Sequence, residues 1–268
     1  MPFRYKQILT MNNKCRTCGS TQTIFYFAIK NLRVIRCIEC SHVFLDTAHT
    51  ESSIKALYEN YDNQLKNSYF KGITAVTRNN INKYLKHCLN LLSSNNIPTL
   101  LDIGCGIGTL MEEAKKNGFI TEGVEICEEL AKIASKNTGS TIYTDFLEKL
   151  PLPSEHYNII TMYDLLEHLK SPENEIRHAH RTLKKGGILF ILCPNDNAMI
   201  RIISKYIYFS TFHLVSKPMK ILYYRDHLSY FTKKSLTTLL ERNGFEITSI
   251  KTKTKSLKDL IYPDSTKF

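Results

Sequence analysis

Short apolar runs alternate with amphipathic stretches along residues 98–250. Helices are expected between the apolar runs, and one such helix is expected over Ser235–Arg242, before a strand at Phe245–Ile250. Parallel strands buried on both faces show continuous apolar runs, so the pattern predicts an α/β fold with a doubly wound, mostly parallel sheet. The runs typical of its strands are 100–103, 119–125, 141–143, 157–162 and the stretch between Gly187 and Pro194.

Helical patterns are also expected before and after these strands. Apolar positions at helical spacing predict a short helix in 51–61 and a longer one in 73–92, which would form a connector over residues 51–97. The stretch from about 195 to 227 is apolar and aromatic, and we expect it to be a substrate lid inserted into the domain 98–268. A membrane-surface contact or a dimer contact would give the same periodicity.

A glycine run follows the strand at 100–103. Gly104, Gly106 and Gly108 let the backbone turn sharply and approach a ligand, with Asp102 just before them. The third glycine comes one residue too early for the dinucleotide pattern G-x-G-x-x-G. The pattern D-x-G-x-G-x-G instead resembles motif I of S-adenosylmethionine-dependent methyltransferases of the Rossmann-like class.

This resemblance implies a set of cofactor-binding residues after successive strands. It implies that the loop of Asp102 and the three glycines wraps the amino-acid end of S-adenosylmethionine. Glu125 lies about 20 residues past the glycines, where an acidic side chain accepts hydrogen bonds from ribose hydroxyls. By the same resemblance, the carboxylate of Asp145 and the backbone N–H of Phe146 would contact adenine. Tyr163 is expected to line the cofactor-binding pocket.

Three further motifs narrow the resemblance. They are Glu167-His168, the strand entry Leu183-Lys-Lys-Gly-Gly187, and Asp226-His-Leu-Ser-Tyr-Phe231. Together they look like the ubiquinone-biosynthesis-type branch of small-molecule methyltransferases. An acceptor hydroxyl or acidic C–H needs a general base, and imidazoles titrate near neutral pH, so His168 and His227 are the catalytic candidates. A purely structural role for each histidine is the alternative.

Four of the eight cysteines have metal-binding spacing. Cys15 and Cys18 form one pair, Cys37 and Cys40 another, and 18 residues separate the pairs. Alternating residues between the pairs predict a hairpin with its turn at Lys30-Asn31, which would bring the four thiolates together. This spacing is typical of a zinc ribbon, here expected over residues 1–50. Four thiolates leave no open position, so Zn²⁺ would be structural.

Composition and charge bear on location and partners. No signal-peptide pattern and no apolar run of membrane-spanning length occurs, and the cysteine usage favours reduced thiols, so a cytoplasmic location without a membrane span is expected. The net charge of +11 divides into +5 over residues 1–50, −2 over 51–196 and +8 over 197–268. These basic flanks suit an anionic partner, although a solvated basic surface is the alternative.

The leading hypothesis is therefore a methyltransferase that acts on an oxygen or carbon of a small, anionic acceptor such as a sugar nucleotide. An RNA methyltransferase that uses the ribbon to hold RNA is one alternative. A binding protein that has lost turnover is another.

Overall fold

The computed structural model describes residues 10–11, 13–46, 75–92, 96–224 and 226–252. The chain forms two compact units. The first unit is made of Met1–Ala48, Leu166–Arg177 and Cys193–Thr252, and the second of His49–Leu165, His178–Leu192 and Lys253–Phe268. The helix expected in 51–61 lies outside the described residues. Within the described ranges, no helix combines the length and the apolar character that crossing a bilayer requires.

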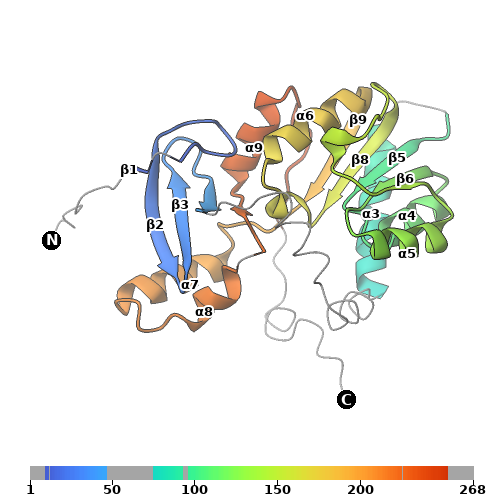
Figure 1. The fold of residues 1–268 in the computed structure, drawn as a ribbon. Coiled ribbons are helices and arrows are strands. Elements are labelled where there is room, and N and C mark those ends of the chain that lie inside the picture. Colours follow the sequence, from blue (N-terminus) through green and yellow to red (C-terminus); the bar gives the residue numbers. More distant parts are fainter. Residues whose placement is uncertain (1–9, 12, 47–74, 93–95, 225, 253–268) are drawn as a thin grey trace, which may run out of the picture. The chain divides into compact units, whose positions relative to one another are not determined.

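The second unit contains a parallel five-stranded sheet in the order β7-β6-β5-β8-β9 (Figure 1). The predicted α/β class is thereby confirmed. The register of β8 with β9 shifts between Tyr157 and Ile159, where β9 carries Gly186 and Gly187. The strands of this parallel sheet are β5 (Thr99–Ile103), β6 (Ile120–Val124), β7 (Ile142–Tyr143), β8 (Tyr157–Tyr163) and β9 (Leu183–Leu192).

Helices alternate with these strands, as the apolar spacing predicts. Leu85 of α3 and Leu110 of α4 pack with Leu100 and Ile159 of the sheet in one apolar cluster, so α3 and α4 share a face of it. The glycine loop therefore ends directly at the first turn of a helix anchored in the core. The helices are α3 (Ala75–Leu91), α4 (Thr109–Lys116), α5 (Glu128–Thr138), the short 3₁₀ helix η1 (Leu147–Lys149) and α6 (Pro172–Thr182).

The first unit contains an antiparallel sheet in the order β1-β2-β3-β4-β10. The predicted hairpin forms from β2 and β3, with Lys30 at positive φ in its turn. β10 comes from far along the chain and pairs with β4, with Tyr230 opposite Val43. The strands are β1 (Thr10–Met11), β2 (Thr23–Ile29), β3 (Leu32–Cys37), β4 (Val43–Leu45) and β10 (Ser229–Tyr230).

Two helices from the expected lid pack on this antiparallel sheet. Tyr208 of α7 and Met219 of α8 join Phe27 and Leu45 in its apolar core. Residues 245–250 do not form the predicted strand, because the chain leaves the last helix at Gly244 with positive φ and meets no strand edge there among the described residues. The helices of this unit are η2 (Leu166–His168), α7 (Met199–Ser210), α8 (Lys217–Leu222) and α9 (Lys233–Arg242).

Candidate functional site

The glycine loop between β5 and α4 has a backbone that favours glycine. Gly104, Gly106 and Gly108 have φ values of 73°, 55° and 86°. A Cβ at Gly104 would lie 2.8 Å from Leu165 Cδ1, and one at Gly108 would lie 2.8 Å from Thr138 Cγ2. The loop thus turns tightly beside its neighbours and presents backbone N–H groups at the N-terminus of α4, as a ligand-binding loop requires.

Asp102 lies in β5 just before this loop and is buried, with 2% of its surface exposed. The hydroxyl of Thr161 in β8 donates a hydrogen bond of 2.6 Å to its Oδ1. Burial raises the pKa of Asp102 to about 7, the Thr161 hydrogen bond opposes this rise, and the neighbouring Glu125 adds to it. The carboxyl group therefore changes its protonation near neutral pH, where a cationic ligand would favour its charged form.

Glu125 follows β6 and holds the glycine loop. Its Oε2 accepts a hydrogen bond of 2.9 Å from the N–H of Gly106, and its Oε1 accepts one of 2.9 Å from the N–H of Cys127. Burial raises the pKa of Glu125, and the N–H groups of Cys127 and Gly106 counteract the rise. Each carboxylate oxygen can accept a second hydrogen bond, so both remain able to bind ribose hydroxyls.

The remaining cofactor candidates lie along the same sheet edge. Asp145 and Phe146 follow β7, Glu125 follows β6, Gly104 follows β5 and Tyr163 ends β8, which places them in strand order at the carboxyl edge. Oδ1 of the exposed Asp145 accepts a 2.8 Å hydrogen bond from the N–H of Phe146. An adenine would have to replace that bond. Tyr163 is half-buried, and burial raises its pKa to about 12.

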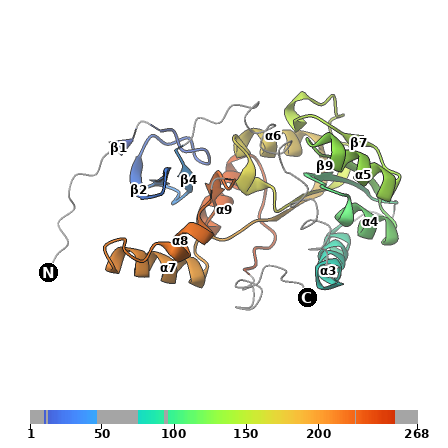
Figure 2. The same ribbon diagram turned by 60° about the horizontal axis from the view of Figure 1, so that its bottom comes forward.

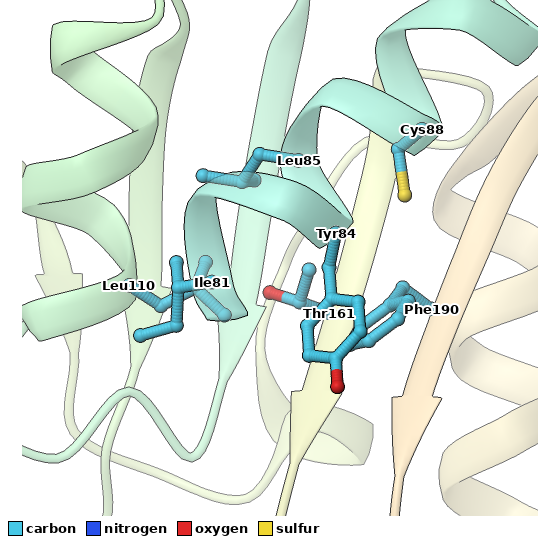
Figure 3. A pocket seen from close by; sticks show the side chains of 7 residues that line it. All are labelled: Ile81, Tyr84, Leu85, Cys88, Leu110, Thr161 and Phe190. Carbon is cyan, nitrogen blue, oxygen red and sulfur yellow. The ribbon is translucent and has the colours of Figure 1, made fainter. Parts of the chain in front are cut away.

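A narrow apolar pocket lies between α3 and the sheet in this unit (Figure 3). Thr161, the hydrogen-bond partner of Asp102, contributes its hydroxyl-bearing side chain to the wall. Burial raises the pKa of the Cys88 thiol to about 11, which keeps it unreactive. We interpret the pocket as a packing gap behind Asp102. Its lining residues are Ile81, Tyr84, Leu85, Cys88, Leu110, Thr161 and Phe190.

His168 and His227 lie side by side in the other unit, next to Glu167. The two imidazole centroids are 4.7 Å apart with perpendicular rings, and Oε1 of Glu167 lies 4.0 Å from Nε2 of each ring. Nδ1 of His168 lies 2.8 Å from the carbonyl oxygen of Asp226, which can only accept a hydrogen bond. In the neutral ring Nδ1 therefore carries the proton and Nε2 is the basic nitrogen.

The surroundings of the two histidines make them unequal as bases. Burial lowers the pKa of His168, and the carbonyl of Asp226 works against that effect. Burial lowers the pKa of His227 to about 3, and the charges of His168 and Arg201 reinforce the effect. Nε2 of His227 also lies 2.6 Å from the hydroxyl of Tyr224. Both lowered pKa values leave the rings neutral at neutral pH, and Nε2 of His227 is engaged by Tyr224.

The four predicted zinc ligands come together at one end of the antiparallel sheet. Their sulfur atoms all lie within 4.8 Å of one another, with separations of 3.6 Å for Cys15 to Cys40 and 3.5 Å for Cys18 to Cys37. All four are free thiols. A tetrahedral site with Zn–S bonds of about 2.3 Å has sulfur–sulfur edges of about 3.8 Å. The donor set and its spacing therefore fit Zn²⁺.

Several polar contacts could not be expected from sequence. Thr161 lies 59 residues from its partner Asp102, and the buried carboxylate of Asp196 binds Lys205 and Tyr223 in the first unit. Their residue types are common, and no local motif distinguishes these positions. The cofactor candidates thus gather in the second unit, and the histidines and cysteines in the first.

Comparison with known proteins shows what this arrangement resembles. A family model described as a methyltransferase domain matches residues 76–250. A ubiquinone biosynthesis O-methyltransferase of Coxiella burnetii is 31% identical over 120 residues, which are 43% of this chain and 50% of that protein. The chain spans about half the length of the curated relatives it matches.

Solved structures share the fold at lower identity. A SAM-dependent methyltransferase of Thermotoga maritima, described as a possible histamine N-methyltransferase, has a TM-score of 0.53 and 23% identity, with 72% of this chain and 81% of that chain covered. The plantazolicin methyltransferase BpumL in complex with SAH has a TM-score of 0.53 and 17% identity, with 71% and 74% covered. These two likenesses show the fold.

Proposed function

This chain belongs to the methyltransferase-domain family, and from that premise we propose that the protein transfers a methyl group from S-adenosylmethionine to a small anionic acceptor. The observation that carries the proposal is the pairing of the glycine loop with Glu125. A buried carboxylate fixed by two backbone N–H groups beside a tight glycine turn suits a nucleoside with a charged amino-acid tail.

The order of residues along the sheet edge supports the proposed cofactor roles. We assign the amino-acid end to the loop of Asp102, Gly104, Gly106 and Gly108, and the ribose to Glu125. Asp145 and Phe146 are assigned to adenine, and Tyr163 to the pocket wall. When bound, S-adenosylmethionine supplies an electrophilic methyl group, so the protein's task is chiefly alignment.

The acceptor proton needs a destination when a hydroxyl or acidic carbon is methylated. We assign it to Nε2 of His168, because Nδ1 is held by the Asp226 carbonyl. His227 and Glu167 then position His168 and surround the charge it gains. The curated relatives are named O-methyltransferases, which supports an oxygen acceptor. The net positive charge of residues 1–50 and 197–268 supports an acceptor molecule that is anionic.

Zn²⁺ is proposed as a structural ion on Cys15, Cys18, Cys37 and Cys40. The ion would join the segment before β2 to the segment after β3, at one end of a small sheet that continues through β4 into β10. The strands of this sheet are short, and a metal stabilises small folds of this kind.

The test is calorimetric titration of the zinc-loaded protein with S-adenosylmethionine and S-adenosylhomocysteine. Methyl transfer to anionic phenols, sugar nucleotides and RNA is then measured. Both nucleosides should bind, Glu125→Ala should weaken binding about a hundredfold, and a small anionic molecule should be methylated. A folded protein that binds neither nucleoside would overturn the proposal. Methylation of RNA alone would overturn the assigned acceptor class.

A further inference from the structure

Helix α7 presents an apolar face to the outside. Met199, Ile202, Ile203, Tyr206 and Phe209 recur at spacings of three and four residues, which places them on one side of the helix. Their exposed fractions run from 41% for Phe209 to 74% for Tyr206. A surface helix of a soluble domain usually directs such a stripe into the core, so this orientation is unusual.

The opposite side of α7 is buried: Tyr208 joins the apolar core there, and Arg201 and Lys205 make polar contacts. Lys205 Nζ lies 2.6 Å from Oδ2 of Asp196, and the hydroxyl of Tyr223 donates a 2.5 Å hydrogen bond to Oδ1 of the same carboxylate. The Arg201 guanidinium lies 4.9 Å from the centroid of the Tyr223 ring and 5.1 Å from that of Tyr230. These contacts fix the rotation of the helix, so its apolar stripe is held outward by specific bonds.

The apolar surface continues through the following turn into α8. Phe212 and Leu214 are 88% and 86% exposed, and Ile221 of α8 is 63% exposed. Both ribbon views show α7 and α8 side by side (Figures 1 and 2), and the two helices pack on each other. Ten of the fifteen exposed large apolar side chains of the described residues lie between Met199 and Tyr224. We call this surface the α7–α8 face.

Charge identifies what the α7–α8 face would meet. The sequence from Asn197 to Arg225 contains five lysines and arginines and no aspartate or glutamate. Arg201 and Lys205 are turned inward, whereas Lys217 and Lys220 of α8 are exposed. Exposed apolar and aromatic side chains with basic neighbours and no acidic ones are the pattern of a segment that lies in a membrane interface.

We propose that the α7–α8 face binds the surface of an anionic phospholipid bilayer. Tyr206, Phe212 and Leu214 would enter the boundary between headgroups and acyl chains, and Lys217 and Lys220 would contact lipid phosphates. A second copy of the chain is a poorer occupant. Because the segment has no acidic side chain, two such faces would bring lysines together without opposite charges. The inference does not depend on the proposed methyl transfer.

The test is flotation of the full-length protein with lipid vesicles. Vesicles of phosphatidylcholine and phosphatidylglycerol at about three to one should carry the protein, and pure phosphatidylcholine should carry much less. Tyr206→Ser with Leu214→Ser should weaken binding about tenfold, because exposed side chains can be replaced without opening the core. Lys217→Glu with Lys220→Glu should weaken it at least about tenfold, and only on anionic vesicles.

Matched variants elsewhere serve as controls. Ile97→Ser replaces a 66% exposed apolar side chain, and Lys132→Glu with Lys136→Glu reverses two exposed charges on α5. Both should bind vesicles like the unaltered protein. Absence of vesicle binding would overturn the proposal, as would equal binding by all variants. A dimer in light scattering that Tyr206→Ser with Leu214→Ser dissociates, without vesicle binding, would assign the face to a second copy instead.

Discussion

The carboxylate of Glu125 accepts a hydrogen bond of 2.9 Å from the backbone N–H of Gly106. The acidic residue expected to bind ribose is therefore also the residue that holds the glycine loop. Its second oxygen is held by the N–H of Cys127 at the start of α5. One side chain thus connects the loop after β5 to the helix after β6, and cofactor affinity and loop order should change together.

Glu125→Gln separates charge from shape at this position. The amide retains one acceptor oxygen but directs an NH₂ group at a backbone N–H, so one of the two fixing bonds is lost. We expect affinity for S-adenosylmethionine to fall about thirtyfold, less than for Glu125→Ala. Calorimetry measures this, with the exposed Glu128→Gln as control. Equal affinity of Glu125→Gln and the unaltered protein would contradict the ribose role.

The elements that depend on local sequence were the predictable ones. Three local features set the backbone conformation of their own residues, and the structure confirms each of them. They are the strand in the apolar run 100–103, the turn at the glycines after it and the hairpin turn at Lys30-Asn31. The pairing of β10 with β4 joins residues about 190 apart in sequence and has no local signal. The rotation of α7 was unpredictable for the same reason, because it depends on the distant partner Tyr223 as well as on the nearby Asp196.

Gly104→Ala should destabilise the second unit more than Gly118→Ala does. Both glycines have positive φ, at 73° and 84°, so alanine strains the backbone at each by about 1 kcal/mol. Only at Gly104 would the new Cβ also meet a side chain, Leu165 Cδ1 at 2.8 Å, whereas nothing lies within 4 Å at Gly118. In urea unfolding, the free energy of unfolding should be lower by about 1–2 kcal/mol for Gly104→Ala than for Gly118→Ala. Equal decreases in the free energy of unfolding for the two variants would show that the glycine loop accommodates the new Cβ without strain.

Asp102→Asn should change how stability depends on pH. The folded-state pKa of Asp102 is raised from 3.8 to about 7, so the folded protein retains a proton that the unfolded chain releases above pH 4. The stability from this group is greatest below pH 4 and is lost as pH rises towards 7. Asparagine does not titrate. Relative to the unaltered protein, the Tm of Asp102→Asn should therefore increase by about 3 °C between pH 5 and pH 8.

Ligand-free protein is used for this melting experiment, because a bound cation would change the protonation of Asp102. Glu128→Gln, on an exposed surface, should melt in parallel with the unaltered protein at both pH values. A Tm difference for Asp102→Asn that stays constant from pH 5 to pH 8 would show that the Asp102 carboxyl group is not shifted.

The four-cysteine cluster should retain zinc. The metal should be needed for the stability of the first unit and not for cofactor binding by the second unit. Elemental analysis should find zinc in the purified protein, and Cys18→Ser should remove most of it, since serine is a poor ligand. Chelation should lower the melting temperature of the antiparallel sheet, whereas S-adenosylmethionine should still bind the second unit. Cys193→Ser is the control and should keep its zinc. A zinc-free protein with unchanged melting would contradict the prediction.

His168→Asn should lower turnover without lowering cofactor affinity. Its Nε2 is assigned as the base, and removal of a general base costs about a hundredfold or more in kcat. His227→Asn should cost less, about tenfold, because that ring has a pKa of about 3 and binds the Tyr224 hydroxyl. Since burial lowers the pKa of His168, the acid limb of the unaltered pH profile should lie below pH 6.5 and be absent from His168→Asn. An unchanged kcat for His168→Asn, or a larger decrease in kcat for His227→Asn, would show that His168 is not the general base.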